Sequence, residues 1–179
     1  MFEENDSSWW SNFNNCLKAV IEDGLNLKYV KNQTYELCLI AVKNTGWALE
    51  YVIDKKREFC FLAIKDDPLT FRFVENQDEI LCLFAVSRNG WNLQYVKEQT
   101  KKICMAAVKQ NPLCIGLVKN QTKKICLEAI RLDASSIVHI KNPTFDMYIE
   151  VIKQDKKNIK YIDKNKFPEI KYIWRLMYE

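Results

Sequence analysis

An all-α fold, an α-solenoid of about seven 22-residue helix-turn-helix repeats with a C-terminal capping helix, is the fold class that the sequence predicts. Three observations favour it. Six of the seven cysteines recur every 22 residues, one position of every repeat carries a residue that can cap a helix, and the 179 residues include only four glycines and four prolines. So few turn residues exclude a sandwich or barrel of many short strands. A fixed period of this length is the signature of a repeat architecture.

The periodic cysteine defines the repeat, and we call it position 1. The periodic cysteines are Cys16, Cys38, Cys60, Cys82, Cys104 and Cys126. Position 4 is alanine in all six of these repeats, position 5 is valine or isoleucine, and positions 12 and 15 are always apolar. A seventh repeat keeps this apolar frame but has Tyr148 in place of the cysteine. These positions are the predicted core.

The first helix of each repeat is expected to run from position 20 to position 7 of the next repeat. Positions 22, 1, 4 and 5 have the spacing of a buried helical stripe. Position 19 precedes the stripe with residues whose side-chain oxygen can accept a hydrogen bond from the first-turn amides, except at Lys56 and Lys166. The capping residues predicted there are Thr34, Asp78, Thr100, Thr122 and Thr144.

A second, shorter helix of about seven residues is expected after position 8. Position 8 carries an N-capping residue type in all seven repeats: Asp23, Thr45, Asp67, Asn89, Asn111, Asp133 and Asp155. Position 9 then holds Pro68 or Pro112, which suit the first helical position, or a glycine, which can also end the preceding helix. The glycines at this position are Gly24, Gly46 and Gly90.

Two helices this short cannot bury their apolar faces alone, so neighbouring repeats must stack into one core. We therefore expect a single repeat domain over 1–179, with an N-terminal cap at 1–11 that includes Trp9 and Trp10, and repeats over 12–165. A capping helix at 166–179 is expected to follow, because its apolar residues share one helical face. Those residues are Ile170, Ile173, Trp174, Met177 and Tyr178.

A β/α horseshoe is the alternative fold. The segments Leu27-x-Tyr29-x-x-Asn32 and Phe71-x-Phe73-x-x-Asn76 are similar to the strand of 20–29-residue leucine-rich repeats. However, such repeats require a further leucine three residues before the first, where this chain has glycine, proline or alanine. A strand would also leave seven capping residues unexplained, so the helical solenoid is favoured.

The string C-x-x-A-V-K-x-N-G-W-x-L-x-Y-V, approximated in Cys38–Val52 and Cys82–Val96, resembles a known repeat family. It is similar to domain-of-unknown-function family 4116, which is common in giant DNA viruses of amoebae and in some protists and algae. Gly46-Trp47 and Gly90-Trp91 alternate with Pro68-Leu69 and Pro112-Leu113, a 44-residue period close to that family's two-repeat length. The resemblance covers about residues 12 to 165 and is weaker in the last third. It implies a helical repeat and carries no catalytic residues.

Charge and hydropathy exclude several classes of protein. The net charge is +4 and the pI is near 8.6. This composition is much less basic than that of dedicated nucleic-acid binders. Charged residues interrupt every apolar run, so we expect no membrane span. The first six residues are acidic where a secretory signal would be basic and then apolar, which favours an intracellular, cytoplasmic location, in the host cytoplasm if the protein is viral.

The cysteines are expected to be reduced core residues. Equivalent positions of stacked helices lie roughly 8–10 Å apart, whereas a disulfide requires Cα atoms within about 7 Å. We therefore expect no disulfide, no metal site and no cofactor, although Cys114 lies outside the period without an assigned place. The sequons Asn32-Gln33-Thr34 and Asn120-Gln121-Thr122 are interpreted as loops between repeats.

No catalytic site is predicted. His139 stands at position 14, where most other repeats carry an aromatic residue, and is interpreted as a variant packing residue. Ser135, Ser136 and Asp133 precede it on one short helix, and such neighbours do not supply a nucleophile, a base and an orienting group around a cleft. The chain is therefore expected not to be an enzyme.

A basic strip and two tryptophans are the candidate binding residues. Position 6 gives Lys43, Lys65, Lys109, Arg131 and Lys153, and position 16 gives Lys97 and Lys119, together with Lys31 and Lys141. Stacking would align each set, although the helix dipole alone favours cations at position 6. Trp47 and Trp91, at position 10, are either interface anchors or core residues. We expect a scaffold that binds a protein partner; the alternative is nucleic-acid binding through the basic columns.

Overall fold

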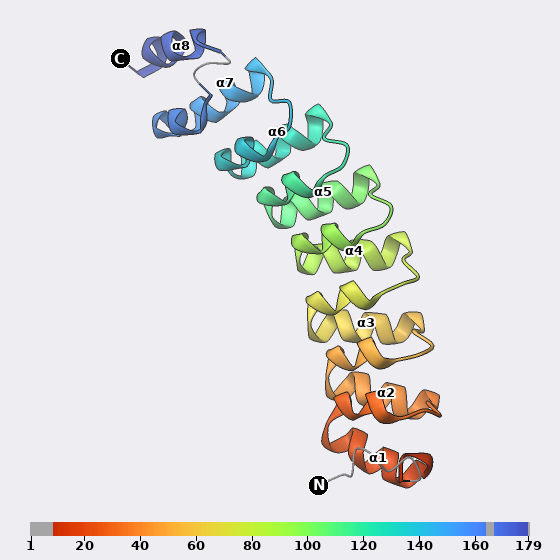
Figure 1. Ribbon diagram of the computed structural model, residues 1–179. Coiled ribbons are helices and arrows are strands. Elements are labelled where there is room, and N and C mark those ends of the chain that lie inside the picture. Colours follow the sequence, from red (N-terminus) through yellow and green to blue (C-terminus); the bar gives the residue numbers. More distant parts are fainter. Residues whose placement is uncertain (1–8, 164–166, 179) are drawn as a thin grey trace. The chain divides into compact units, whose positions relative to one another are not determined.

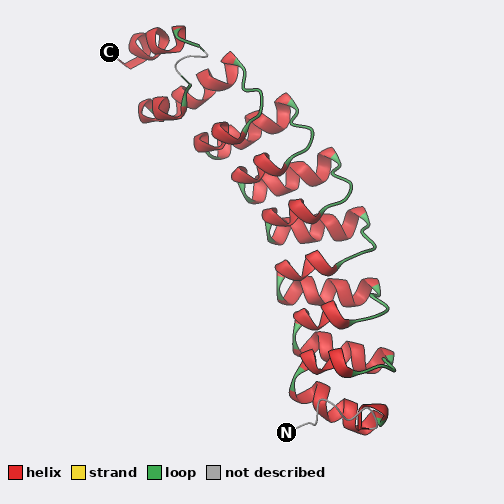
Figure 2. Cartoon of the chain, viewed as in Figure 1, coloured by secondary structure: helices red, strands yellow, loops and turns green. Residues whose placement is uncertain are grey.

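The computed structural model of the protein describes residues 9–163 and 167–178, and every regular element in them is a helix. Each α-helix has ten residues. The α-helices are α1 (Phe13–Glu22), α2 (Tyr35–Asn44), α3 (Arg57–Asp66), α4 (Glu79–Arg88), α5 (Lys101–Gln110), α6 (Lys123–Leu132), α7 (Phe145–Gln154) and α8 (Glu169–Tyr178). From α2 to α7 they begin at position 20 and end at position 7, as predicted. Figure 2 shows helices and loops without a strand in the described chain, so the β/α horseshoe is wrong.

The second helix of each repeat is present, but it is a six-residue 3₁₀ helix. These helices are η2 (Gly24–Tyr29), η3 (Gly46–Tyr51), η4 (Pro68–Phe73), η5 (Gly90–Tyr95), η6 (Pro112–Leu117), η7 (Ala134–His139) and η8 (Lys156–Tyr161); a shorter one, η1 (Trp9–Ser11), precedes α1. The apolar residues at positions 12 and 15 are three apart, so a helix with three residues per turn places both on one face. The amide of Val30 also donates to the carbonyl of Leu27, 3.0 Å away.

The predicted N-caps are confirmed at position 8. In all seven repeats the side-chain oxygen at this position accepts a hydrogen bond from the amide at position 10, as Asp23 does from Leu25. At position 19, Thr34, Asp78 and Thr100 accept such a bond from the first turn of the α-helix. Thr122 and Thr144 occupy the predicted N-cap position, but their side chains accept no such hydrogen bond.

The position-9 glycines do not act as left-handed helix ends. No described residue has a positive φ, and the helices end at position 8 in extended backbone. A close approach explains the glycines instead. A Cβ added at Gly24, Gly46 or Gly90 would lie 2.5 to 2.7 Å from the main-chain carbonyl oxygen at position 4 of the next repeat. Glycine therefore lets neighbouring repeats approach.

The chain divides into two compact units, residues 1–85 and 86–179. In the first unit, α1, α2 and α3 contact one another in chain order, and η2, η3 and η4 contact one another beside them (Figure 1). The two kinds of helix enclose a core of residues from positions 1, 4, 5, 12, 15 and 22, all nearly inaccessible to solvent. Trp10 is buried and its ring contacts that of Tyr29. Residues 1–8 of the predicted N-terminal cap lie outside the described residues.

The second unit repeats this arrangement in α5, α6 and α7 with η5 to η8. Its last helix, α8, packs on α7 and η8. The indole nitrogen of Trp174 donates to the carbonyl of Lys156 (2.8 Å), and the hydroxyl of Tyr178 donates to that of Ile152 (2.6 Å). The predicted start of this helix, residue 166, lies outside the described residues. No helix in the described chain is long and apolar enough to span a membrane.

Candidate interaction surfaces

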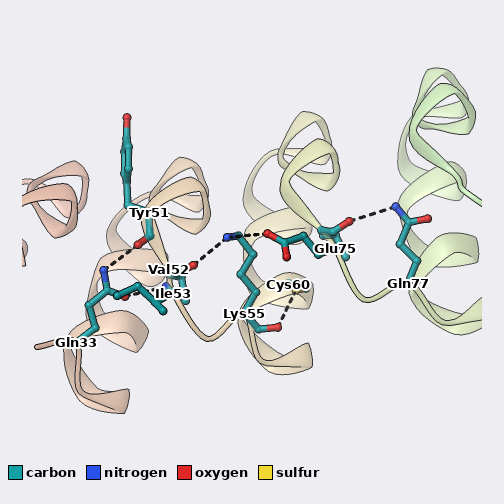
Figure 3. Close-up of polar contacts among 9 residues, drawn as sticks. Gln33, Tyr51, Val52, Ile53, Lys55, Cys60, Glu75 and Gln77 are labelled. Carbon is teal, nitrogen blue, oxygen red and sulfur yellow. Dashed lines mark hydrogen bonds and ion pairs between the residues drawn. The ribbon is translucent and has the colours of Figure 1, made fainter. Parts of the chain in front are cut away.

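Glutamines at position 18 link the backbones of neighbouring repeats. The side-chain amide of Gln33 donates to the carbonyl of Tyr51 in the next repeat (2.8 Å), and its oxygen accepts from the amide of Ile53 (2.9 Å) (Figure 3). It also reaches the carbonyl of Leu27 in its own repeat, 3.5 Å away. One side chain thereby bonds three main-chain groups, of which the carbonyl of Tyr51 and the amide of Ile53 belong to the next repeat.

The same contacts recur at Gln99 and Gln121. Gln99 donates to the carbonyls of Leu93 and Leu117 and accepts from the amide of Lys119. Gln121 donates to the carbonyls of Ile115 and His139 and accepts from the amide of Lys141. From the sequence, Gln121 was interpreted only as a loop residue and Gln99 was given no role. The recurrence of glutamine at position 18, also seen at Gln77, was the available signal.

Lys55 replaces the position-18 glutamine in one repeat. Its ammonium donates to the carbonyl of Val52 (2.9 Å) and forms an ion pair with Glu75 of the next repeat (3.4 Å), as Figure 3 shows. Glu75 stands at position 16, where four other repeats carry lysine. An ion pair between neighbouring repeats thus takes the place of the glutamine contacts.

The periodic cysteines are buried beside these glutamines. The thiol of Cys38 lies 3.6 Å from the side-chain oxygen of Gln33, and that of Cys104 lies 3.8 Å from the oxygen of Gln99. Each thiol is a weak hydrogen-bond donor to an oxygen that also accepts a hydrogen bond from a main-chain amide. Burial raises the pKa of the thiols, that of Cys60 to about 11. Cys114, at position 11, is fully buried with its sulfur against Gly90, and burial raises its pKa to about 11. It is a packing residue.

Positions 7 and 9 of neighbouring repeats are matched. The amides of Gly24, Gly46 and Gly90 donate to side-chain oxygens at position 7 of the next repeat; the acceptors are Asn44 (2.9 Å), Asp66 (2.7 Å) and Gln110 (2.6 Å). Position 9 is proline, which has no amide hydrogen, at Pro68 and Pro112. Position 7 of the repeat that follows is then Arg88 or Leu132, whose side chains have no hydrogen-bond acceptor. This relationship explains the alternation of repeat types.

The position-6 column of the basic strip is exposed but partly neutralised. Lys109 faces Glu128 at 4.0 Å, and Arg131 forms an ion pair with Glu150 at 3.3 Å; both acids stand at position 3 of the next repeat. Lys43, Lys65 and Lys153 are exposed as well. The column therefore contributes to contacts between repeats and is less positive than its lysines and arginine alone would make it.

The position-16 column lies along the loops between repeats. Lys97, Lys119 and Lys141 are exposed there, and the ammonium of Lys119 donates to the carbonyl of Lys97 (3.3 Å). A cavity of about 370 Å³ opens between two of these loops. Its lining includes Lys119, Lys123 and Lys141 with amide and hydroxyl side chains, and no acidic residue. The first unit has an equivalent cavity of about 510 Å³, whose charged lining residues are Lys31, Lys56 and Asp54.

Charge is distributed unequally between the two units. Residues 1–85 have 9 Lys and Arg against 14 Asp and Glu, a net charge of −5. Residues 86–179 have 18 against 9, a net charge of +9. The mild overall charge therefore conceals a strongly basic second unit.

The two candidate tryptophans differ. Trp47 is half-buried; its indole nitrogen donates to Asp67 (3.0 Å), Arg72 stacks over its ring (4.9 Å), and Phe73 contacts its edge. Trp47 thus packs against the next repeat. Trp91 is 42% exposed. Its own position, position 10, is apolar in five consecutive repeats: Leu25, Trp47, Leu69, Trp91 and Leu113.

The residues around His139 do not form a catalytic arrangement. His139 is exposed, and its main-chain carbonyl accepts from Gln121. Asp133 caps η7 by accepting from the amide of Ser135, and Ser136 is buried. Among the described residues, no group of three or more His, Cys, Asp and Glu is arranged to hold a metal ion.

These features define a helical-repeat protein whose recurring residues join one repeat to the next. Residues 78–123 match the family model of the domain of unknown function DUF4116, which confirms the family resemblance for that part of the chain. No curated protein and no solved structure matches the chain.

Proposed function

We propose that the protein is a non-enzymatic helical-repeat scaffold that binds a protein partner through its position-10 column. The column consists of Leu25, Trp47 and Leu69 in the first unit and Trp91 and Leu113 in the second. Leu25, Leu69 and Trp91 are 36 to 42% exposed, although each is a large apolar residue. Exposed large apolar side chains favour protein contacts, and aromatic residues, tryptophan above all, are enriched at the residues that dominate protein interfaces. This column is the observation that carries the proposal.

The repeat uses some positions for structure and leaves others exposed and variable, which supports a binding role. Position 18 joins backbones, positions 8 and 19 cap helices, and the cysteines and glycines permit close packing. The exposed positions change chemically from repeat to repeat, as at position 10, where Ser135 and Lys157 replace the apolar residues. Such a surface can be specific for one partner while the stack is retained.

The location and source belong to the same proposal. An intracellular, cytoplasmic site of action fits a scaffold with buried reduced thiols. The viral distribution of the family suggests a giant-virus protein that acts on host or viral partners.

Affinity capture tests this function. The full chain is immobilised, incubated with lysate of the cells in which it acts, with and without nuclease, at 50 and 200 mM salt, and the captured proteins are identified by mass spectrometry. One protein set that survives nuclease and the higher salt supports the scaffold. Capture that vanishes with nuclease would overturn it.

Nucleic-acid binding is the second candidate, because the net charge of +9 in residues 86–179 favours an anionic partner. Binding of this kind would fall steeply with salt, since contacts with phosphates release counterions. It would also be lost when Lys43, Lys65 and Lys109 are reversed to glutamate. Partial neutralisation at position 6 argues against it.

A further inference from the structure

The cavity between the loops of the second unit has the features of a site for carboxylates. We infer that it binds an acidic, extended peptide of the partner, with Lys119, Lys123 and Lys141 contacting its side chains. This inference rests on the proposed function and names a chemistry for one part of the partner. The volume of the cavity, about 370 Å³, lies in the range of small-ligand sites, roughly 300–1,000 Å³.

The charges of the lining residues favour an anion. Three lysines line the cavity and no acid does. Lys119 donates only to a main-chain carbonyl, which leaves its charge uncompensated, and Lys141 has no ion-pair partner in the described chain. Lys123 pairs with Asp146 at 2.8 Å, but both side chains are more than 60% exposed, so that pair is weak and exchangeable.

The hydrogen-bonding groups complete the site. Asn120, Asn142 and Thr144 line the same cavity and can donate to carboxylates or to a peptide backbone. Gln121 lines it too, but its amide is already bound to the carbonyls of two repeats, which fixes the position of the cavity wall. The site is therefore held by the same contacts that hold the stack.

The spacing of the lysines favours a peptide over a nucleic acid. Lys97, Lys119 and Lys141 recur once per repeat, and packed helices lie roughly 8–10 Å apart. In an extended polyproline II conformation every third residue lies on the same side of the chain, about 9 Å further along it, so carboxylates with that spacing meet successive repeats. A nucleic-acid strand has one charge about every 3.4 Å along the axis, and most would remain unpaired. The cavity lining also includes no aromatic residue on which a base could stack.

The equivalent cavity of the first unit predicts selectivity. Asp54 lines it beside Lys31 and Lys56, and position 16 is Ile53 or Glu75 in the neighbouring repeats. A carboxylate in the cavity of the first unit would face one acidic residue and two lysines, whereas the cavity of the second unit offers three lysines and no acid. Binding should therefore depend on residues 119–141 and not on residues 31–56.

Fluorescence anisotropy of the full chain tests this inference. The probes are a fluorescein-labelled 13-residue peptide with glutamate at every third position among serine and alanine, the same peptide with glutamine, and a labelled twelve-nucleotide oligo-dT. The cavity variant is Lys119→Glu/Lys141→Glu, and Lys119→Gln/Lys141→Gln checks charge removal alone. The matched control is Lys156→Glu/Lys160→Glu, exposed residues of the same unit outside the cavity.

The expected result is binding of the glutamate peptide that weakens at least tenfold in both cavity variants and less than twofold in the control. Equal loss in the control would overturn the inference in favour of diffuse charge. Tighter binding of oligo-dT than of the glutamate peptide, through the same lysines, would also overturn the inference. If the captured proteins were in addition lost on nuclease treatment, the proposed function would fail as well. If the peptide does not bind while a nuclease-resistant protein set is still captured, only the inference fails.

Discussion

The side-chain amide of Gln33 donates a 2.8 Å hydrogen bond to the main-chain carbonyl of Tyr51, one repeat further along the chain. This bond crosses between repeats that share no helix. Gln33 also accepts from the amide of Ile53, so one residue fixes both the distance and the register of two neighbouring loops.

Gln33→Leu should lower the free energy of unfolding by about 2 kcal/mol, because a half-buried carbonyl and an amide lose their partner. Denaturation followed by circular dichroism measures the change. The control is Gln94→Leu, since Gln94 is exposed and donates only to Trp91 three residues before it. Equal loss in the two variants would show that the glutamine does not stabilise the stack.

The helices could be predicted from the sequence because their determinants are local. The cap at position 8 and the apolar spacing of positions 22, 1, 4 and 5 define both ends of α2 without knowledge of its neighbours. The 3₁₀ form of the second helix was missed, although Leu27 and Val30, three residues apart, already indicate it. Apolar spacing over six residues distinguishes poorly between helix types.

Contacts between repeats were harder to predict. Gln33 was interpreted as part of a loop because its partners lie 18 and 20 residues away. The pair of Arg131 with Glu150 was missed for the same reason, and the predicted basic strip therefore included a position-6 column that is partly neutralised. In both cases the contact depends on how neighbouring repeats are placed against each other in space. The sequence pattern within one repeat does not contain that information.

Gly46→Ala should destabilise the protein by about 1–3 kcal/mol, because the new Cβ would lie 2.7 Å from the carbonyl oxygen of Ala63. Gly116→Ala is the matched control. A Cβ at Gly116 would come no closer than 3.4 Å to another atom, so this change should be neutral or slightly stabilising. Thermal unfolding of both variants gives the comparison, and tolerance of alanine at Gly46 would contradict the close-approach explanation.

Asn44→Leu should cost about 1–2 kcal/mol, since the amide of Gly24 loses its acceptor and the carbonyl of Ile21 loses its donor. The reciprocal change, Leu132→Asn, should bring no gain, because Pro112 has no amide hydrogen to donate. Chemical denaturation measures both. A stabilising Leu132→Asn would be inconsistent with the matching of positions 7 and 9.

Stability should fall as pH rises through the range 9 to 11. Burial raises the pKa of Cys60 and Cys114 to about 11 from an ordinary value of 9.0, so the folded state retains protons that the unfolded chain releases. A group with a raised pKa stabilises the fold below its unfolded value, and this contribution is lost as pH approaches the folded value. Denaturation at pH 8, 9, 10 and 11 should show a smaller decline in Cys60→Ala/Cys114→Ala than in the unmodified chain; an equal decline would exclude these thiols as its cause.

The most direct test of the central claim replaces the two most exposed residues of the position-10 column while leaving the stack intact. Leu69→Ser/Trp91→Ser is compared with the unmodified chain in quantitative capture from nuclease-treated lysate, with circular dichroism to verify folding. The account predicts at least a fivefold loss of the captured protein set with little change in melting temperature, because both side chains are 42% exposed. Undiminished capture by the folded variant would contradict the assignment of position 10 as the protein-binding surface.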